Sequence, residues 1–223
     1  MSVVAAVAGR RSSPPRVGRL VLIDASPDAL AVARRNLSGV LNVEFHHASV
    51  GALPMENASL DFAYSLGVLH HVPDTAAAIR SLAAKLKPGA PFLIYLYYAF
   101  DNRGVGYWAL WKISDWVRRV VSRMPFALRY PASQVLAALV YWPMARSARV
   151  LGKVGLLPNS WPLAYYRDKP FYVLRTDALD RFGTCLEQRF TRAEIHAMLS
   201  DAGFVDIHFS DQAPYWCVVG IRG

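Results

Sequence analysis

The side chain with the clearest chemical use is a carboxylate at the end of an apolar run. Asp24 closes the sequence LVLID at 20–24, which is typical of a strand buried on both faces. Ligands of open α/β sheets bind beyond the carboxyl ends of the strands. A carboxylate placed there can accept two charge-assisted hydrogen bonds from a ribose diol. The alternative is an aspartate that caps the following helix, and position alone does not separate these two interpretations.

Two adjacent histidines are the next candidates for chemistry. His70 is a weak candidate for a general base, and a structural histidine that packs against a cofactor is the alternative. Neighbouring side chains such as His70 and His71 do not converge easily on one ion, and no Cys or acid stands at metal-ligand spacing. We therefore expect no metal. Cys185 and Cys217 are too few for a disulfide scaffold, and we expect both thiols to be buried.

Strand and helix signals alternate around these residues. Ser26 is a candidate N-cap and Pro27 a candidate first residue for the helix after LVLID. Further strands are expected at 42–46, 60–65, 91–98, 205–210 and 215–222, and further helices at 72–89 and 191–204. This alternation predicts an α/β fold with a parallel sheet and an antiparallel addition at its end.

Four segments, in this order, resemble the class I S-adenosylmethionine-dependent methyltransferases, in the small-molecule group with a quinone-biosynthesis-like pattern. They are LVLID (20–24), HHASVGALP (46–54), SLGVLHHVPD (65–74) and LKPGAPFLIYLY (86–97). The resemblance covers 20–98 and 186–223. It implies a Rossmann-like methyltransferase sheet that uses S-adenosylmethionine as its cofactor.

The resemblance also implies where the cofactor lies. The expected contacts stand at the ends of three strands: Asp24, Ala25, Ala48, Ser49, Val50, Ser65, Leu66 and Gly67. In the family, the acid of the first group holds the ribose, the second group lies against adenine, and the third lies beside the methionine part. This chain departs from the pattern at Ser49, where the family often has Asp.

One motif of the family is missing. A glycine-rich GxGxG turn should follow the first strand, roughly 20 residues before Asp24, and residues 1–19 contain none. We expect residues 2–8 to be the last turns of a helix, with a polar connection behind them and the central first strand absent. The chain then resembles an N-terminally truncated methyltransferase with weakened cofactor binding. The GVG at 104–106 is not the missing loop, because bulky Tyr107 and Trp108 follow it.

The positive charge is concentrated in one segment. The chain has 25 Lys and Arg against 16 Asp and Glu, a net charge of +9. Residues 101–185 hold 13 of the basic and 5 of the acidic residues, a net of +8, together with five of the six tryptophans. We therefore expect an α/β core formed by 1–100 and 186–223, and a large helical insertion at 101–185 that acts as a cap or lid.

The insertion suggests a partner as well as a fold. Residues 107–124 and 131–155 are expected helices, and basic charge with Trp is typical of a helix that lies on an anionic membrane. A cap packed on the enzyme body is the alternative. We do not expect nucleic acid to bind, because no groove-reading motif is present and SLGV stands where amino-group nucleic-acid methyltransferases carry (Asp/Asn)-Pro-Pro-(Tyr/Phe).

These observations predict methyl transfer from S-adenosylmethionine to a small-molecule or lipid-like acceptor. The alternative is a non-catalytic methyltransferase remnant with a membrane-associated helical cap. No apolar run reaches the ~18 residues of a spanning helix. We therefore expect a cytoplasmic protein with peripheral membrane contact through 107–155.

Overall fold

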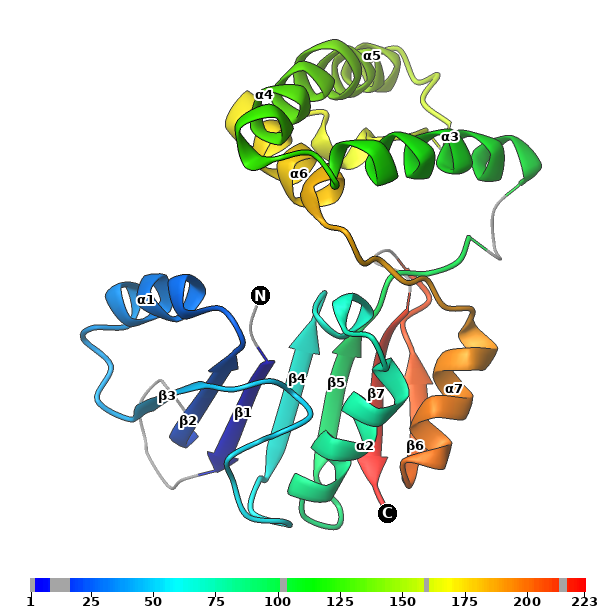
Figure 1. Ribbon diagram of the computed structural model, residues 1–223. Helices are drawn as coiled ribbons and strands as arrows, with labels where there is room; N and C mark the ends of the chain where they lie inside the picture. The colour runs from blue at the N-terminus through cyan, green and yellow to red at the C-terminus, as the bar shows by residue number, and fades with distance from the viewer. Residues whose placement is uncertain (1–2, 9–16, 101–103, 159–160, 213–215) are drawn as a thin grey trace. The chain divides into compact units, whose positions relative to one another are not determined.

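A computed structural model describes residues 3–8, 17–100, 104–158, 161–212 and 216–223 (Figure 1). The chain divides into two compact units. The first, called the α/β unit below, comprises Met1–Asp101 and Gln188–Gly223, and the second, the helical unit, comprises Asn102–Glu187. Residues 10–16 of the expected polar connection and residue 215 of the last expected strand lie outside the described residues.

The α/β unit contains a mixed sheet of seven strands. Their order across the sheet is β3-β2-β1-β4-β5-β7-β6. The strands are β1 (Val3–Ala8), β2 (Val17–Asp24), β3 (Val43–His47), β4 (Phe62–Leu66), β5 (Pro91–Tyr95), β6 (Phe204–Phe209) and β7 (Cys217–Arg222). β2 and β3 are parallel, as are β4 and β5, whereas β7 is antiparallel to both β5 and β6. The expected α/β class and the antiparallel end of the sheet are confirmed.

Helices cover both faces of this sheet. The side chains of β2 alternate between the two faces and contact helices on each. Leu22 points to one face, where it packs with Leu30 of α1 (Pro27–Asn36). Val21 and Ile23 point to the other face and join the main core, which includes residues of α2 (Thr75–Lys85) and α7 (Arg192–Asp201). The layers are visible in Figure 1.

The helix starts follow the capping signals of the sequence. Ser26 Oγ accepts a hydrogen bond from the Ala29 amide at 3.3 Å, and Asp74 Oδ1 accepts one from the Ala77 amide at 2.8 Å. Thr191 and Glu194 form a reciprocal capping box at the start of α7. These contacts satisfy backbone amides that the first turn of a helix leaves without a partner.

The first strand is a correction to the sequence analysis. Residues 3–8 were expected as helix, with the central strand of the sheet absent, and both expectations are wrong. Residues 3–8 form β1, which is antiparallel to both β2 and β4 and places Val3 opposite Ile23 and Ser65. A short apolar run does not separate helix from strand by its periodicity. The strand is favoured here because β2 and β4 would otherwise each leave an unpaired row of backbone groups.

The helical unit has its own core. It is built from α3 (Val105–Val121), α4 (Phe126–Leu136), the π-helical segment η2 (Ala137–Tyr141), α5 (Trp142–Lys153), the short 3₁₀ turn η3 (Ala164–Tyr166) and α6 (Phe171–Gly183). Buried residues from α3, η2 and α6, among them Val121, Tyr141, Leu174 and Phe182, pack together. The helix expected at 131–155 is instead formed by α4, η2 and α5, which together extend from Phe126 to Lys153 and include a π-helical turn.

Two further features of the helical unit were not predicted from the sequence. Helix α6 was not expected from the sequence, and Cys185, which was expected to be buried, is exposed. Cys185 follows the end of α6, and its thiol donates to the carbonyl of Ser122 at 3.2 Å. Among the helices that the structure describes, none has the length and hydropathy needed to cross a bilayer.

Candidate cofactor site

The expected site residues gather at one edge of the sheet. β1 is antiparallel to both β2 and β4, so β2 and β4 run in the same direction, and β3 and β5 run with them. The carboxyl ends of all four strands therefore meet at the same edge. Asp24 ends β2 and Leu66 ends β4, with the first residue of β1 between these strands.

Asp24 is fixed at this edge by the residues around it. Its side chain is buried, with only 5% of the residue exposed. Its Oδ1 accepts a hydrogen bond from the Ser26 amide at 2.7 Å, and its carbonyl accepts one from the Ala48 amide at 3.2 Å. Ser26, not Asp24, is the N-cap of α1. The carboxylate thus supports the start of the helix without serving as its cap.

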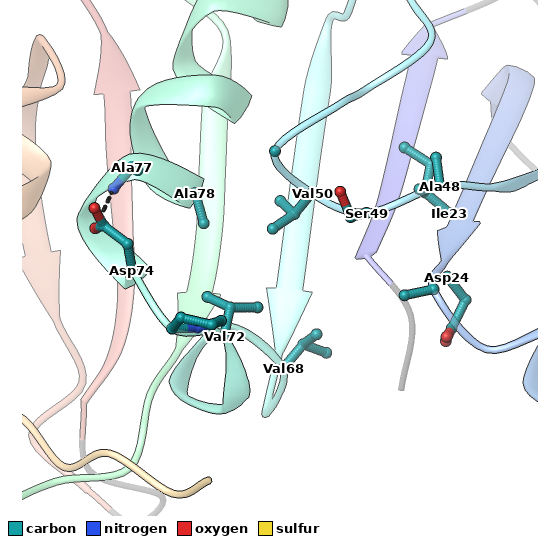
Figure 2. Close-up of a pocket in the computed structure, with 13 residues that line it drawn as sticks. Ile23, Asp24, Ala48, Ser49, Val50, Val68, Val72, Asp74, Ala77 and Ala78 are labelled. Atoms are coloured by element: carbon teal, nitrogen blue, oxygen red, sulfur yellow. Dashed lines mark hydrogen bonds between the residues drawn. The ribbon is translucent and has the colours of Figure 1, made fainter.

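A pocket of about 400 Å³ opens beside Asp24 (Figure 2). This volume lies within the range of about 300–1,000 Å³ that is usual for small-ligand sites. The lining residues come from the end of β2, the loop after β3, and the segment from η1 (Leu69–His71) into α2: Ile23, Asp24, Ala25, Ala48, Ser49, Val50, Gly51, Val68, Val72, Pro73, Asp74, Ala77 and Ala78. The structure therefore brings five of the eight expected cofactor residues into one pocket.

The wall formed by Val68, Val72 and the first turn of α2 was not among the expected contacts. Figure 2 shows Val68 and Val72 at the pocket and the Asp74 carboxylate directed at the Ala77 amide, whose hydrogen bond caps the helix. The first turn of a helix carries partial positive charge. The signal for this wall was the VPD at 72–74, which belongs to the same motif as the expected contacts at 65–67.

The remaining three expected residues do not line the pocket. Ser65 is completely buried, and its Oγ has no hydrogen-bond partner among the described residues. Leu66 is exposed at the end of β4. Gly67 adopts a φ of +71°, a conformation that favours glycine, and its amide donates to the Tyr95 carbonyl at 3.1 Å. Residues 65–67 thus lie at the same edge but outside the pocket, which the turn reaches only at Val68.

His70, the weak catalytic candidate, is buried against an aromatic ring. It is fully buried, its ring stacks on that of Tyr97 with a centroid distance of 3.7 Å, and neither ring nitrogen has a partner in the described part of the chain. Burial, reinforced by the neighbouring His71 and Arg189, lowers the pKa of His70 from 6.5 to about 2. The imidazole is therefore neutral at physiological pH and a poor acceptor of a proton.

No three His, Cys, Asp or Glu side chains of the described ranges lie close enough together to share a metal ion. The pocket is instead lined by apolar side chains with two carboxylates, those of Asp24 and Asp74. This set of groups suits an organic ligand that combines an apolar ring with hydroxyl groups.

Comparison with known proteins identifies the family. The model of the family described as "Methyltransferase domain" matches residues 4–94. A ubiquinone biosynthesis O-methyltransferase of Methylocella silvestris is 32% identical over 130 residues, which are 53% of this chain and 50% of that protein. A ubiquinone/menaquinone biosynthesis C-methyltransferase of an Enterobacter species is 38% identical over 81 residues, which are 34% of this chain and 32% of that protein. The chain thus spans half or less of the length of these two relatives.

A solved structure adds evidence on the fold alone. A methyltransferase candidate from Bacillus halodurans superposes with a TM-score of 0.52 at 14% sequence identity, covering 88% of this chain and 58% of that one. The α/β methyltransferase-like fold, with its mixed sheet and several helices, agrees with the family match. Residues 4–94 thus match the class I S-adenosylmethionine-dependent methyltransferase family, and the ubiquinone-biosynthesis methyltransferases are distant relatives of this part of the chain.

Proposed function

We propose that the pocket beside Asp24 binds S-adenosylmethionine and that the chain transfers its methyl group to a small or lipid-like acceptor. The observation that carries the proposal is the buried carboxylate of Asp24 at the carboxyl end of β2, facing a pocket of about 400 Å³. The quinone-biosynthesis names of the distant relatives support an acceptor of low polarity.

The chemistry of the pocket fits the nucleoside part of this cofactor. Asp24 would accept hydrogen bonds from the ribose hydroxyls, and its burial makes these bonds stronger than they would be in water. Val50, Val68 and Val72 supply apolar surface for the adenine ring. Ser49 and Gly51 lie on the same wall, where backbone groups would reach the ring edge.

The cofactor brings an electrophilic methyl group on a positively charged sulfur, so the protein has little covalent chemistry to supply. Its residues must bind the cofactor, align the acceptor with the methyl group and exclude water. An acceptor that has to lose a proton also needs a base. Because burial keeps His70 neutral, we assign it a packing role against Tyr97 and leave the base unassigned.

A second function is supported by a specific observation. The central position of the sheet is filled by β1, which is antiparallel to its neighbours, and residues 1–19 contain no glycine-rich turn. In the family, that turn follows the first strand and lets the backbone approach the cofactor. A chain that holds the cofactor too weakly for turnover would be a non-catalytic remnant with a membrane-associated helical cap.

Calorimetric titration with S-adenosylmethionine separates these proposals. We expect wild-type protein to release or absorb heat on binding, and Asp24→Asn to weaken binding by about 10- to 100-fold, the equivalent of losing charge-assisted hydrogen bonds. Asp28→Asn is the matched control, because Asp28 is an exposed acid in the first turn of α1. The absence of heat up to millimolar cofactor, with the protein folded, would reject the binding proposal.

Turnover needs its own measurement. Protein that binds the cofactor is incubated with methyl-labelled S-adenosylmethionine and either a lipid extract or a set of small phenols. Label in the extracted product supports the enzyme, and the partition of label between the two acceptor sets distinguishes lipid-like from small polar acceptors. Binding without any transfer of label would favour the remnant.

A further inference from the structure

The helix α3 has its polar and apolar faces reversed relative to an ordinary surface helix. Asp115 and Arg118 point inward, and each is only 6% exposed. Ile113 and Trp116 point outward and are 63% and 68% exposed. A helix that places an ion pair inside and a tryptophan outside has a surface whose function the fold of the helical unit does not explain.

The buried ion pair has a structural role. Arg118 donates to Asp115 Oδ1 through Nε at 3.0 Å and through Nη2 at 2.7 Å. Its Nη1 also donates to the carbonyls of Thr184 and Cys185, at 2.9 and 3.1 Å, just beyond the end of α6. This network joins α3 to α6 and satisfies the buried charges. It therefore accounts for the inward face of the helix.

The outward face carries one continuous apolar stripe. Its members are spaced three or four residues apart, so they lie above one another on the helix surface. We name it the outer stripe: Val105, Ala109, Ile113, Trp116 and Val120. All five are exposed. Exposed apolar surface on consecutive turns of one helix marks an interaction site more often than scattered single residues do.

Basic residues lie beside the outer stripe. Lys112 is exposed, with its Nζ 4.9 Å from the Trp108 ring centroid, and Arg123 is exposed further along the chain. Arg119 is exposed as well, but its Nη2 pairs with Asp115 Oδ2 at 2.8 Å. Asp115 is the sole acidic residue of α3, and it is buried on the other face. The outward face of α3 is therefore apolar and positively charged, without an acid.

These features identify one class of partner. A second copy of the chain would bring the same positive face against this one, which like-charge repulsion opposes. A nucleic acid would match the charge but not the aliphatic Val105, Ile113 and Val120. An anionic membrane matches both, because its headgroups attract Lys and Arg while Trp and aliphatic side chains enter the interface. No described helix spans a bilayer, and α3 is suited to lie in its surface.

We propose that the outer stripe of α3 docks in the headgroup layer of an anionic lipid bilayer, with Lys112 and Arg123 beside the lipid phosphates. The proposal does not depend on cofactor binding or on methyl transfer. It assigns the exposed Trp116 and the exposed cations beside it to a lipid surface, and it is compatible with either function proposed above.

Co-sedimentation with vesicles tests the proposal on the full chain. We expect the protein to pellet with vesicles of equal parts phosphatidylglycerol and phosphatidylcholine at low salt, and much less with pure phosphatidylcholine. The double variant Ile113→Ser/Trp116→Ser should lower the partition coefficient by at least about tenfold. Its matched control is Leu41→Ser/Val205→Ser, two exposed apolar residues of the α/β unit, which should leave the coefficient unchanged.

The charge contribution is tested separately. Lys112→Gln/Arg123→Gln keeps the outer stripe and should lower binding to anionic vesicles by about fivefold for each cation, with a weaker dependence on salt. Arg35→Gln/Arg80→Gln, which removes two exposed cations from α1 and α2, should have no effect. Circular dichroism checks that each variant retains its helices.

Three outcomes would overturn the proposal. The wild-type protein could remain in the supernatant with anionic vesicles at low salt. The stripe variant could pellet as well as its control. Alternatively, the wild-type protein could fail to bind vesicles but form a concentration-dependent dimer by light scattering, and the stripe variant could abolish this dimer. That result would assign the stripe to a second copy of the chain.

Discussion

The two units of this chain differ in where one large aromatic residue and one ion pair lie. In the α/β unit, Phe92 of β5 is completely buried in the core, while the ion pair of Arg19 and Glu44 is exposed. In the helical unit, Trp116 is exposed and the ion pair of Asp115 and Arg118 is buried. The difference shows that a basic, Trp-rich composition does not by itself say which residues fold a segment and which remain available to a partner.

The arginines of the helical unit show this division most clearly. Arg129 donates to the carbonyl of Gly183, and Arg146 donates to the carbonyls of Arg167 and Lys169. Like Arg118, these side chains satisfy backbone oxygens inside the unit. The net charge of +8 in 101–185 therefore overstates the charge that is free to attract an anionic partner, and the residues beside the outer stripe matter more than the total.

The difference between the two units is tested most directly by removing one large aromatic ring from each unit. We expect Phe92→Ala to lower the free energy of unfolding by about 3–5 kcal/mol, because it leaves a cavity in the core. Trp116→Ala should change it by less than about 0.5 kcal/mol, because the ring is mostly in solvent. Urea unfolding followed by circular dichroism measures both values. A similar cost for the two variants would show that Trp116 is part of a core.

The buried ion pair gives the next largest effect. Burial acts to raise the pKa of Asp115, but hydrogen bonds and charge from Arg118 and Arg119 together hold it below its ordinary value. Asp115→Asn leaves Arg118 buried beside a neutral group, and we expect a loss of about 3 kcal/mol in unfolding free energy. Asp168→Asn, which affects an exposed pair with Arg149, should cost less than about 1 kcal/mol in the same experiment. Equal losses of unfolding free energy in the two variants would indicate that the Asp115 pair is exposed to solvent.

The smallest expected effect concerns His70, a titratable group of the α/β unit that is buried without a hydrogen-bond partner among the residues that the structure describes. Because the pKa of His70 is about 2 in the folded protein and 6.5 in the unfolded chain, only the unfolded chain binds a proton between these values. Stability is therefore greatest above pH 6.5 and falls below it, by up to about 1.4 kcal/mol per pH unit. His70→Phe, which retains a ring against Tyr97, should flatten this dependence.

The measurement is the thermal unfolding midpoint from neutral pH down to about pH 5, where an ordinary histidine is protonated. The control is His196→Asn, which removes an exposed histidine on α7 and should leave the slope unchanged. An unchanged slope in His70→Phe would mean that the acid sensitivity comes from other groups.

Much of the α/β unit could be predicted from the sequence because its signals are local. Ser26 caps the helix that it was expected to cap, and the helix expected at 191–204 begins at the capping box of Thr191. The apolar run that ends at Asp24 forms β2, and its last residue reaches the pocket edge. Where a residue type and its immediate neighbours determine the structure, the sequence was sufficient.

The rest depended on contacts between distant segments. The run at 3–8 could form helix or strand, and it is pairing with β2 and β4 that selects the strand. The pocket wall at 68–78 is formed by packing that joins η1 and α2 to the loop after β3. For α6 a local signal existed, since Leu174, Ala178 and Phe182 repeat every four residues and all three are buried. The polar residues around these three positions made the repeat hard to recognise in the sequence.

The direction of β1 has a practical consequence for handling this protein. Val3 pairs with Ile23 and Ser65, so β1 begins at the edge where Ile23 and Asp24 line the pocket. β7 runs the other way relative to β5 and ends opposite Pro91, at the amino edge of the sheet. An affinity tag joined ahead of β1 would therefore emerge beside the pocket at Asp24, whereas a tag joined after Gly223 would emerge at the far edge. Ligand titrations should accordingly use protein purified through its carboxyl terminus.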